Sequence, residues 1–163
     1  MIINTKRFQL KTLTTKDVTE NYLSWFSGSK EVVEYIAYAK TNVDINKLRQ
    51  YVKEREDRED VLFLGIFTNS GQHIGNIKYE PINLKDKSAT MGILIGNKEW
   101  RGKGVATEVI KYSGKYLKEN YKIKYIDLGV NNGNIAAVSA YKKMKFKVIK
   151  KTDLSFMMRL NIE

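Results

Sequence analysis

The segment best suited to bind a ligand is a glycine-containing loop at residues 100–107, whose sequence is W-R-G-K-G-V-A-T. It lies between a predicted strand and a predicted helix. Free backbone N–H groups at a helix start bind anions, and the helix dipole adds to the attraction. Gly102 and Gly104 let the backbone approach a phosphate without a Cβ in the way, and Arg101 or Lys103 adds positive charge. The pattern indicates a pyrophosphate site, although a ligand-free turn between a strand and a helix has the same pattern.

This loop differs from two common nucleotide-binding motifs. It lacks the G-x-x-x-x-G-K-[ST] pattern of nucleoside-triphosphate loops. It also lacks the third glycine of the dinucleotide fingerprint G-x-G-x-x-G, because Thr107 stands at that position. The loop therefore points to a phosphate-bearing ligand outside these two classes.

The elements that would position the loop alternate between strands and helices. Apolar alternation and short apolar runs predict strands, while helical spacing with capping residues predicts helices. The predicted strands cover residues 7–13, 61–68, 73–80, 89–96, 123–130, 146–150 and 154–160. The predicted helices cover residues 44–59, 104–120 and 134–144, a segment from Thr15 or Asp17 to Phe26, and a short helical or irregular piece from Ser29 to Tyr38.

The order of these elements predicts the fold class. Residues 89–130 form a strand, a loop, a helix and a strand, which is normally a right-handed crossover between parallel strands. The remaining strands are joined by hairpins. We therefore expect one α/β (α+β) domain over residues 1–163, with a mixed, mostly antiparallel central sheet and helices on both faces. The length of 163 residues and the apolar share of 42% suit a single domain.

Several segments resemble the GCN5-related N-acetyltransferase (GNAT) family. The motif R-x-x-G-x-A at residues 101–106 resembles the family's coenzyme A loop, (R/Q)-x-x-G-x-(G/A). Residues 91–96 resemble the strand before that loop, and residues 130–146 resemble the family's second signature. Residues 7–26 resemble the branch that contains ribosomal-protein N-terminal acetyltransferases and amino-sugar acetyltransferases. The resemblance covers nearly the whole chain and is most specific over residues 89–146.

The resemblance implies the acyl-CoA N-acyltransferase fold and acetyl-CoA as the acetyl donor. In this family two parallel strands splay apart and the thioester lies between them. The loop amides would bind the pyrophosphate, and the strand before the loop would pair with the pantetheine arm like an added strand. The implied cofactor-binding residues are Ile93, Leu94, Ile95, Arg101, Gly102, Lys103, Gly104, Val105, Ala106, Thr107, Asn131, Asn134, Ala137 and Lys143.

Acetyl transfer to an amine requires three kinds of group. The amine must be neutral to attack, the thioester oxygen needs a hydrogen-bond donor, and the leaving thiolate gains from an acid. A backbone N–H near Leu94 to Gly96 would be the donor. Tyr141 matches the family tyrosine that serves as the acid, although its apolar helical neighbours also suit a core aromatic. Asn134 similarly suits both a cofactor contact and a helix N-cap.

The general base is the least defined part of the site. Many relatives carry a glutamate just before the residues that match Met91-Gly92, whereas this chain has Thr90. A threonine is not a base at neutral pH. Glu80, at the end of the preceding predicted strand, is the carboxylate that we select, acting through water, ahead of Glu99 and Asp127. The alternative is an amine that arrives neutral and needs no base.

Two further residues bear on the turn after the last predicted helix and on metal binding. Lys145 stands where relatives usually have glycine, which predicts a different exit from the preceding helix. His73, the only histidine, lies beside a predicted hairpin turn and is expected to be structural or exposed. Because the chain has no second histidine and no cysteine, no metal site is predicted.

Aromatic side chains near the first two predicted helices are candidates for the lining of the acceptor pocket, and half or more of them are expected to be core instead. The candidates are Trp25, Tyr35 and Tyr38, with Phe26 beside them. Two acceptors remain open, a nucleotide-linked amino sugar and a protein N-terminus. The net charge of +11 suits the diphosphate of the first, which we place ahead, and disfavours polyamines.

The positive charge leaves two alternatives to an enzyme. One is a basic module that binds nucleic acid through the lysines of residues 142–151; no helix-turn-helix or aromatic RNA-binding pattern accompanies them, so nucleic acid is the less favoured partner. The other is a family member that binds acyl-CoA without turnover. No signal segment or membrane-length apolar run is visible, so we expect a cytoplasmic monomer or homodimer with no membrane contact.

Overall fold

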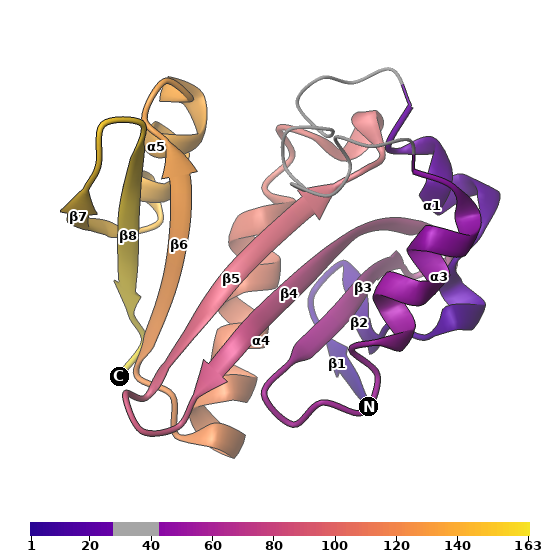
Figure 1. Ribbon diagram of the computed structural model, residues 1–163, viewed down its shortest axis with the longest axis horizontal. Helices are drawn as coiled ribbons and strands as arrows, with labels where there is room; N and C mark the ends of the chain where they lie inside the picture. The colour runs from indigo at the N-terminus through magenta and orange to yellow at the C-terminus, as the bar shows by residue number, and fades with distance from the viewer. Residues whose placement is uncertain (28–42) are drawn as a thin grey trace.

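The computed structural model describes residues 1–27 and 43–163, which form an eight-stranded sheet flanked by helices (Figure 1). The predicted piece from Ser29 to Tyr38 lies outside the described residues. The strands are β1 Ile2–Asn4, β2 Phe8–Thr12, β3 Leu62–Thr68, β4 His73–Asn83, β5 Ser88–Ile95, β6 Tyr125–Asn131, β7 Lys147–Lys151 and β8 Ser155–Asn161. The helices are α1 Glu20–Ser24, α3 Ile45–Lys53, α4 Val105–Tyr121 and α5 Ile135–Lys143, with 3₁₀ turns η1 Thr15–Asp17 and η3 Lys98–Trp100.

The sheet is mixed and mostly antiparallel, as the sequence predicts. Its strand order is β1-β2-β3-β4-β5-β6-β8-β7. Every neighbouring pair is antiparallel except β5 and β6, which are parallel. Helix α4 makes the crossover between these two strands, so the predicted strand–loop–helix–strand unit is confirmed.

Helices cover both faces of the sheet, and each face has its own core. On one face α4 and α5 bury residues such as Val109 and Val138 against the sheet. On the other face α1 and α3 bury residues such as Tyr22 and Leu48 (Figure 1). Strand β3 is buried along its whole length because it lies between the two layers, which explains its continuous apolar sequence.

The N-terminal helix prediction was wrong in its continuity. Instead of one helix to Phe26, the chain forms η1 and then α1, with Val18 in an extended conformation between them. The side chain of Thr19 accepts a hydrogen bond from the N–H of Tyr22 and so starts a second, separate helix. Strand β1 was not predicted from the sequence.

Helix α3 begins where the sequence predicts and ends earlier. Asp44 caps it, accepting a hydrogen bond from the N–H of Lys47 at 2.8 Å. The helix stops at Lys53 instead of running to residue 59. Beyond it, Arg55 forms an ion pair with Glu80 on β4, a tertiary contact that no local pattern reveals.

The exit from α5 corrects the expectation about Lys145. This lysine has φ +79°, the same left-handed conformation that glycine would adopt. The N–H of Lys145 bonds to the carbonyl of Lys142, and the N–H of Phe146 bonds to the carbonyl of Tyr141. These two bonds make a Schellman motif, whose apolar contact is the edge-on packing of Tyr141 and Phe146 at 5.5 Å. The lysine therefore changes the strain in this turn and leaves its geometry intact.

We expect Lys145→Gly to stabilise the protein by about 1 kcal/mol, because a left-handed residue with a Cβ is strained and glycine is not. Urea unfolding should show a higher midpoint with an unchanged slope. Lys142→Gly is the matched control: within the regular part of α5, glycine should destabilise by about 1 kcal/mol. Equal losses in both variants would contradict the strain.

Candidate active site

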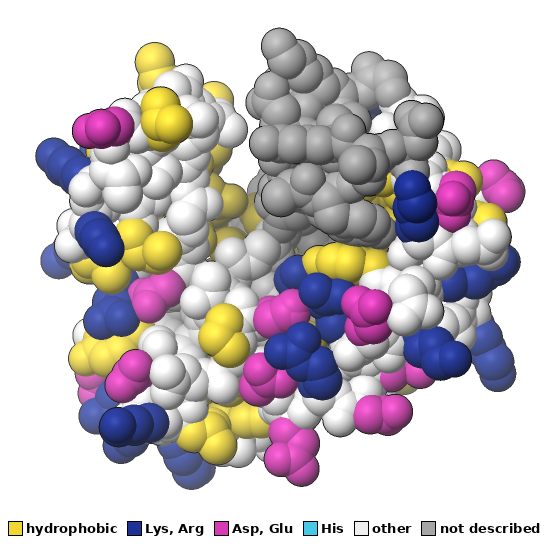
Figure 2. Space-filling model, viewed as in Figure 1, with side chains coloured by type: hydrophobic (Ala, Val, Ile, Leu, Met, Phe, Trp, Pro, Cys, Tyr) yellow, Lys and Arg dark blue, Asp and Glu magenta, His cyan; other side chains and the backbone are white. Residues whose placement is uncertain are grey.

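The two parallel strands part after three residue pairs. Strands β5 and β6 pair only from Ser88 with Tyr125 to Thr90 with Asp127. Both strands then continue without pairing to each other, β5 to Ile95 and β6 to Asn131. Figure 1 shows them diverging, and Figure 2 shows the surface hollowed beside the lobe formed by β6, β8 and β7. Facing backbone edges are therefore left available for a ligand.

The alternation of hydrogen bonds in β5 decides which amides face this gap. The N–H of Gly96 donates to the carbonyl of Ile74 on β4 at 2.9 Å. Since successive residues of a strand point their N–H groups in opposite directions, Leu94 also faces β4, whereas Ile93 and Ile95 face the open edge. The amides of β5 that can bond to a ligand in the gap are therefore those of Ile93 and Ile95, whereas the amides of Leu94 and Gly96 face β4.

The loop after β5 has the backbone that an anion cradle needs. Gly102 and Gly104 both have positive φ, +71° and +75°. Gly104 is the N-cap of α4 and has no side chain with which to cap the helix start. Successive backbone N–H groups in such a turn form a concave, electropositive nest at the positive end of the helix. The exposed loop residues Gly102, Lys103 and Gly104 leave this cradle open.

Two side chains fix the loop to the end of β5. Nε of Arg101 donates to the carbonyl of Ile95 at 3.0 Å. The ring of Trp25 lies against Gly96, where an added Cβ would be 2.0 Å from Cδ2 of the indole. Arg101 therefore holds the loop to the strand, and it also provides the positive charge that the sequence predicts there.

Tyr141 lies half-buried on α5. Its ring packs on Phe146, and within the described residues its hydroxyl makes no hydrogen bond. Burial raises the pKa of Tyr141 above the ordinary value, so the phenol is protonated at neutral pH. Asn134 caps α5 by accepting from the N–H of Ala137 at 3.2 Å, which confirms the N-cap interpretation. Asn131 and Asn134 are exposed at the carboxyl end of β6, which in a parallel pair is the same end as the loop after β5.

Comparison with known proteins identifies the family. Residues 7–147 match the acetyltransferase (GNAT) domain. The chain belongs to the GNAT acetyltransferase family. A match of this extent includes the parting strands, the loop and Tyr141, so the resemblance deduced from the sequence is confirmed.

Solved structures share the fold of this GNAT domain at low identity. The microcin C7 self-immunity acetyltransferase MccE, in complex with acetyl-CoA and AMP, has a TM-score of 0.83 at 16% identity and covers 96% of this chain and 93% of its own. RimL, the ribosomal L7/L12 α-N-protein acetyltransferase in complex with coenzyme A, has a TM-score of 0.85 at 13% identity, with 99% and 98% covered. The spermidine N-acetyltransferase of Vibrio cholerae, in complex with CoA and spermine, has a TM-score of 0.78 at 17% identity, with 94% and 95% covered.

A curated relative matches part of the chain. An N-alpha-acetyltransferase of Saccharolobus solfataricus is 36% identical over 75 residues, which is 46% of this chain and 44% of that protein. The match thus spans less than half of the relative's length. Within residues 1–27 and 43–163, no helix is both long and apolar enough to span a membrane.

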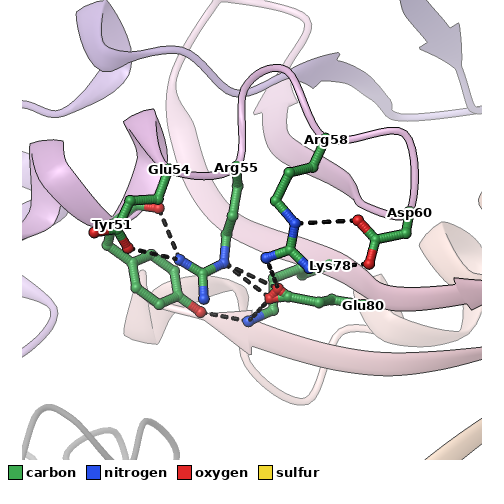
Figure 3. A network of polar contacts seen from close by, with 7 residues as sticks. All are labelled: Tyr51, Glu54, Arg55, Arg58, Asp60, Lys78 and Glu80. Carbon is green, nitrogen blue, oxygen red and sulfur yellow. Dashed lines mark hydrogen bonds and ion pairs between the residues drawn. The ribbon is translucent and has the colours of Figure 1, made fainter.

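Glu80 of the GNAT domain lies in a network of cations on the α3 face (Figure 3). Nε of Arg55 donates to both carboxylate oxygens of Glu80, at 2.9 and 3.1 Å. Arg58 and Lys78 lie 3.6 and 3.8 Å from the same carboxylate. Only 14% of its side chain is exposed. This network anchors the end of α3 to β4, so Glu80 has a structural role whatever its part in catalysis.

Three other candidate residues, Asp127, His73 and Trp25, are each held by contacts within the fold. Asp127, at the last β5–β6 pair, accepts from Nε and Nη2 of Arg159 at 2.7 and 2.9 Å. His73 is buried, with Nε2 2.7 Å from Oδ1 of Asn76, and burial lowers the pKa of His73, so its role is structural. Trp25 is buried, 5% exposed, between the α1 core and the start of the loop. Tyr35 and Tyr38 lie outside the described residues.

Sequence reasoning missed a charged pair beside the loop. Glu108, in the first turn of α4, accepts hydrogen bonds from Oγ1 of Thr5 and from the backbone N–H and Nε of Arg7. The pair joins residues 101 positions apart, so no local spacing could signal it. The only sequence signal was the place of Arg7 in the N-terminal resemblance.

Proposed function

We propose that this protein transfers an acetyl group from acetyl-CoA to a primary amine by direct attack of the amine. The observation that carries the proposal is the gap between β5 and β6, which ends at a loop with two left-handed glycines, the second of which is the N-cap of α4. An extended arm that ends in a diphosphate fits this pair of features. The arm would lie along the open strand edge, and the diphosphate would lie on the loop amides.

The residues present fit acetyl-CoA as the donor. The space beside Gly102 is open, because a Cβ built on this residue would meet nothing within 4 Å. The amides of residues 102–107 would hold the diphosphate, and the amide of Ile95 would bond to the pantetheine arm. The remaining residues deduced from the family, Asn131, Asn134, Ala137 and Lys143, stay predicted contacts. When bound, acetyl-CoA supplies the acetyl group as an activated thioester.

Three groups of the protein would take part in the reaction: a backbone N–H of β5, Tyr141 and Glu80. A backbone N–H on the open edge of β5, at Ile93, which is farther from the loop than Ile95, would donate to the thioester carbonyl oxygen as negative charge develops there. The carbonyl of Ile95 accepts a hydrogen bond from Nε of Arg101, which holds the end of β5 in place. Tyr141 would donate its proton to the departing thiolate, and the raised pKa of its phenol keeps that proton available at neutral pH.

Glu80 is our proposed base, which would take a proton through a water molecule from the substrate ammonium so that the neutral amine can attack. We expect Glu80→Gln to lower kcat about tenfold near pH 7 and to approach the wild-type kcat as the pH rises toward the pKa of the free amine, about 10. The pH profile of kcat for both proteins is the measurement. Asp60→Asn, which removes another acid of the same network, is the control and should leave the shape of the profile unchanged. A loss that is equal at every pH would leave Glu80 only its structural role.

The acceptor is proposed to be an amino sugar on a nucleotide carrier or the N-terminus of a protein. The net charge of +11 supports an acceptor that carries phosphate. The direct test is thiol release from acetyl-CoA in the presence of amino sugars, nucleotide-linked amino sugars, peptides and polyamines. Release with the nucleotide-linked sugar above all others is the expected result. Binding of acetyl-CoA without release for any amine would indicate a family member that binds acyl-CoA without turnover.

A further inference from the structure

Arg7 and Phe8, at the start of β2, brace the phosphate loop at both of its ends. At the loop entry, the ring of Phe8 packs edge-on against Trp100, with ring centroids 5.3 Å apart. At the loop exit, Arg7 bonds to Glu108 in the first turn of α4. These two neighbouring residues thus contact both flanks of the loop, although they are about a hundred positions away in the sequence.

Arg7 is aimed at the glycine that begins α4. Its Nη2 would lie 3.7 Å from a Cβ built on Gly104, which is ordinary van der Waals contact. Nε is bonded to Oε2 of Glu108 at 2.7 Å, and this bond fixes the direction of the guanidinium. Within the described residues no hydrogen bond is formed by the two terminal nitrogens, and 41% of the side chain is exposed. Four N–H donors therefore remain for a ligand.

The charge of Glu108 would oppose an anion at this helix start if it were not compensated. Burial alone would raise the pKa of Glu108, but hydrogen bonds from Arg7 and Thr5 hold the pKa of Glu108 below its ordinary value. The carboxylate is thus ionised within the first turn of α4, next to the cradle. Arg7 neutralises it and presents its free N–H groups on the loop side.

We propose that Arg7 is a donor-binding residue whose terminal N–H groups contact the diphosphate of coenzyme A beside Gly104. The inference rests on the proposed function, which places that diphosphate on the loop. An arginine fork suits this contact because it can bond to Glu108 with one edge and to phosphate oxygens with another. Lysine has no second edge, so Lys cannot replace it fully.

Binding isotherms with three ligands test this contact: coenzyme A, 3′-dephospho-CoA and pantetheine. We expect Arg7→Met to weaken the binding of coenzyme A and of 3′-dephospho-CoA equally, on the order of tenfold, because both carry the diphosphate. Pantetheine, which lacks it, should bind both proteins alike, and S-acetylpantetheine should be used with unchanged kcat/KM. Arg7→Lys should restore only part of the affinity. Lys6→Met, which removes the neighbouring exposed lysine, is the control and should bind like wild type.

The outcomes that overturn the proposal are distinct. A loss confined to coenzyme A would assign Arg7 to the 3′-phosphate and exclude the diphosphate contact. Equal losses for pantetheine would show that Arg7 acts only by holding the fold. Failure of wild-type protein to bind either coenzyme A or 3′-dephospho-CoA would remove the proposed function itself, and the role of Arg7 with it.

Discussion

Replacing Tyr141 with phenylalanine should lower kcat by about 100-fold while changing the Michaelis constant for acetyl-CoA less than threefold, because general acid catalysis contributes a factor of that order. The phenylalanine ring keeps the packing on Phe146 that the helix exit requires. Within the described residues the hydroxyl has no partner, so its removal leaves no other polar group unsatisfied. The effect should therefore appear in turnover and not in stability.

Steady-state kinetics with the best amine, together with the melting temperature, measure this effect. Tyr116→Phe provides the matched control, because it removes another half-buried phenol, from α4, away from the parting strands. It should leave kcat unchanged. An unaltered kcat in Tyr141→Phe would remove the acid role and leave Tyr141 as a core aromatic.

Gly104→Val should weaken acetyl-CoA binding by about 100-fold, since the loop must leave the left-handed conformation and its amides then no longer converge on a phosphate. A β-branched residue is a true outlier at φ +75°. Its side chain would also stand beside Nη2 of Arg7. Isothermal titration of acetyl-CoA measures the loss directly and does not depend on finding the acceptor.

Gly71→Val separates this loss from general strain. Gly71 has φ +91° in the turn between β3 and β4, and a Cβ there would meet nothing within 4 Å. The same substitution should therefore cost comparable stability but leave acetyl-CoA affinity unchanged. If both variants lost affinity equally, the loop would not be the phosphate cradle.

Much of the fold followed from local pattern. Strands β2, β3 and β5, and helices α4 and α5, lie within a few residues of their predicted positions, because their apolar spacing and their caps act over short distances. The exceptions are places where strand pairing or side-chain packing outweighs the local conformational preference of the residues. Strand β1 is three residues long and forms by pairing with β2. Lys145 adopts a glycine conformation because Tyr141 and Phe146 pack together.

By itself the sequence determined the family, and it predicted the phosphate loop and the role of Tyr141, since these depend on residue types at fixed short spacing. Tertiary structure alone decided three things: where β5 and β6 part, which amides of β5 face the gap, and that Arg7 meets Glu108 beside Gly104. Each depends on register or on contacts between segments far apart in the chain. Such contacts are set by how the whole sheet closes on its helices, and no local spacing encodes them.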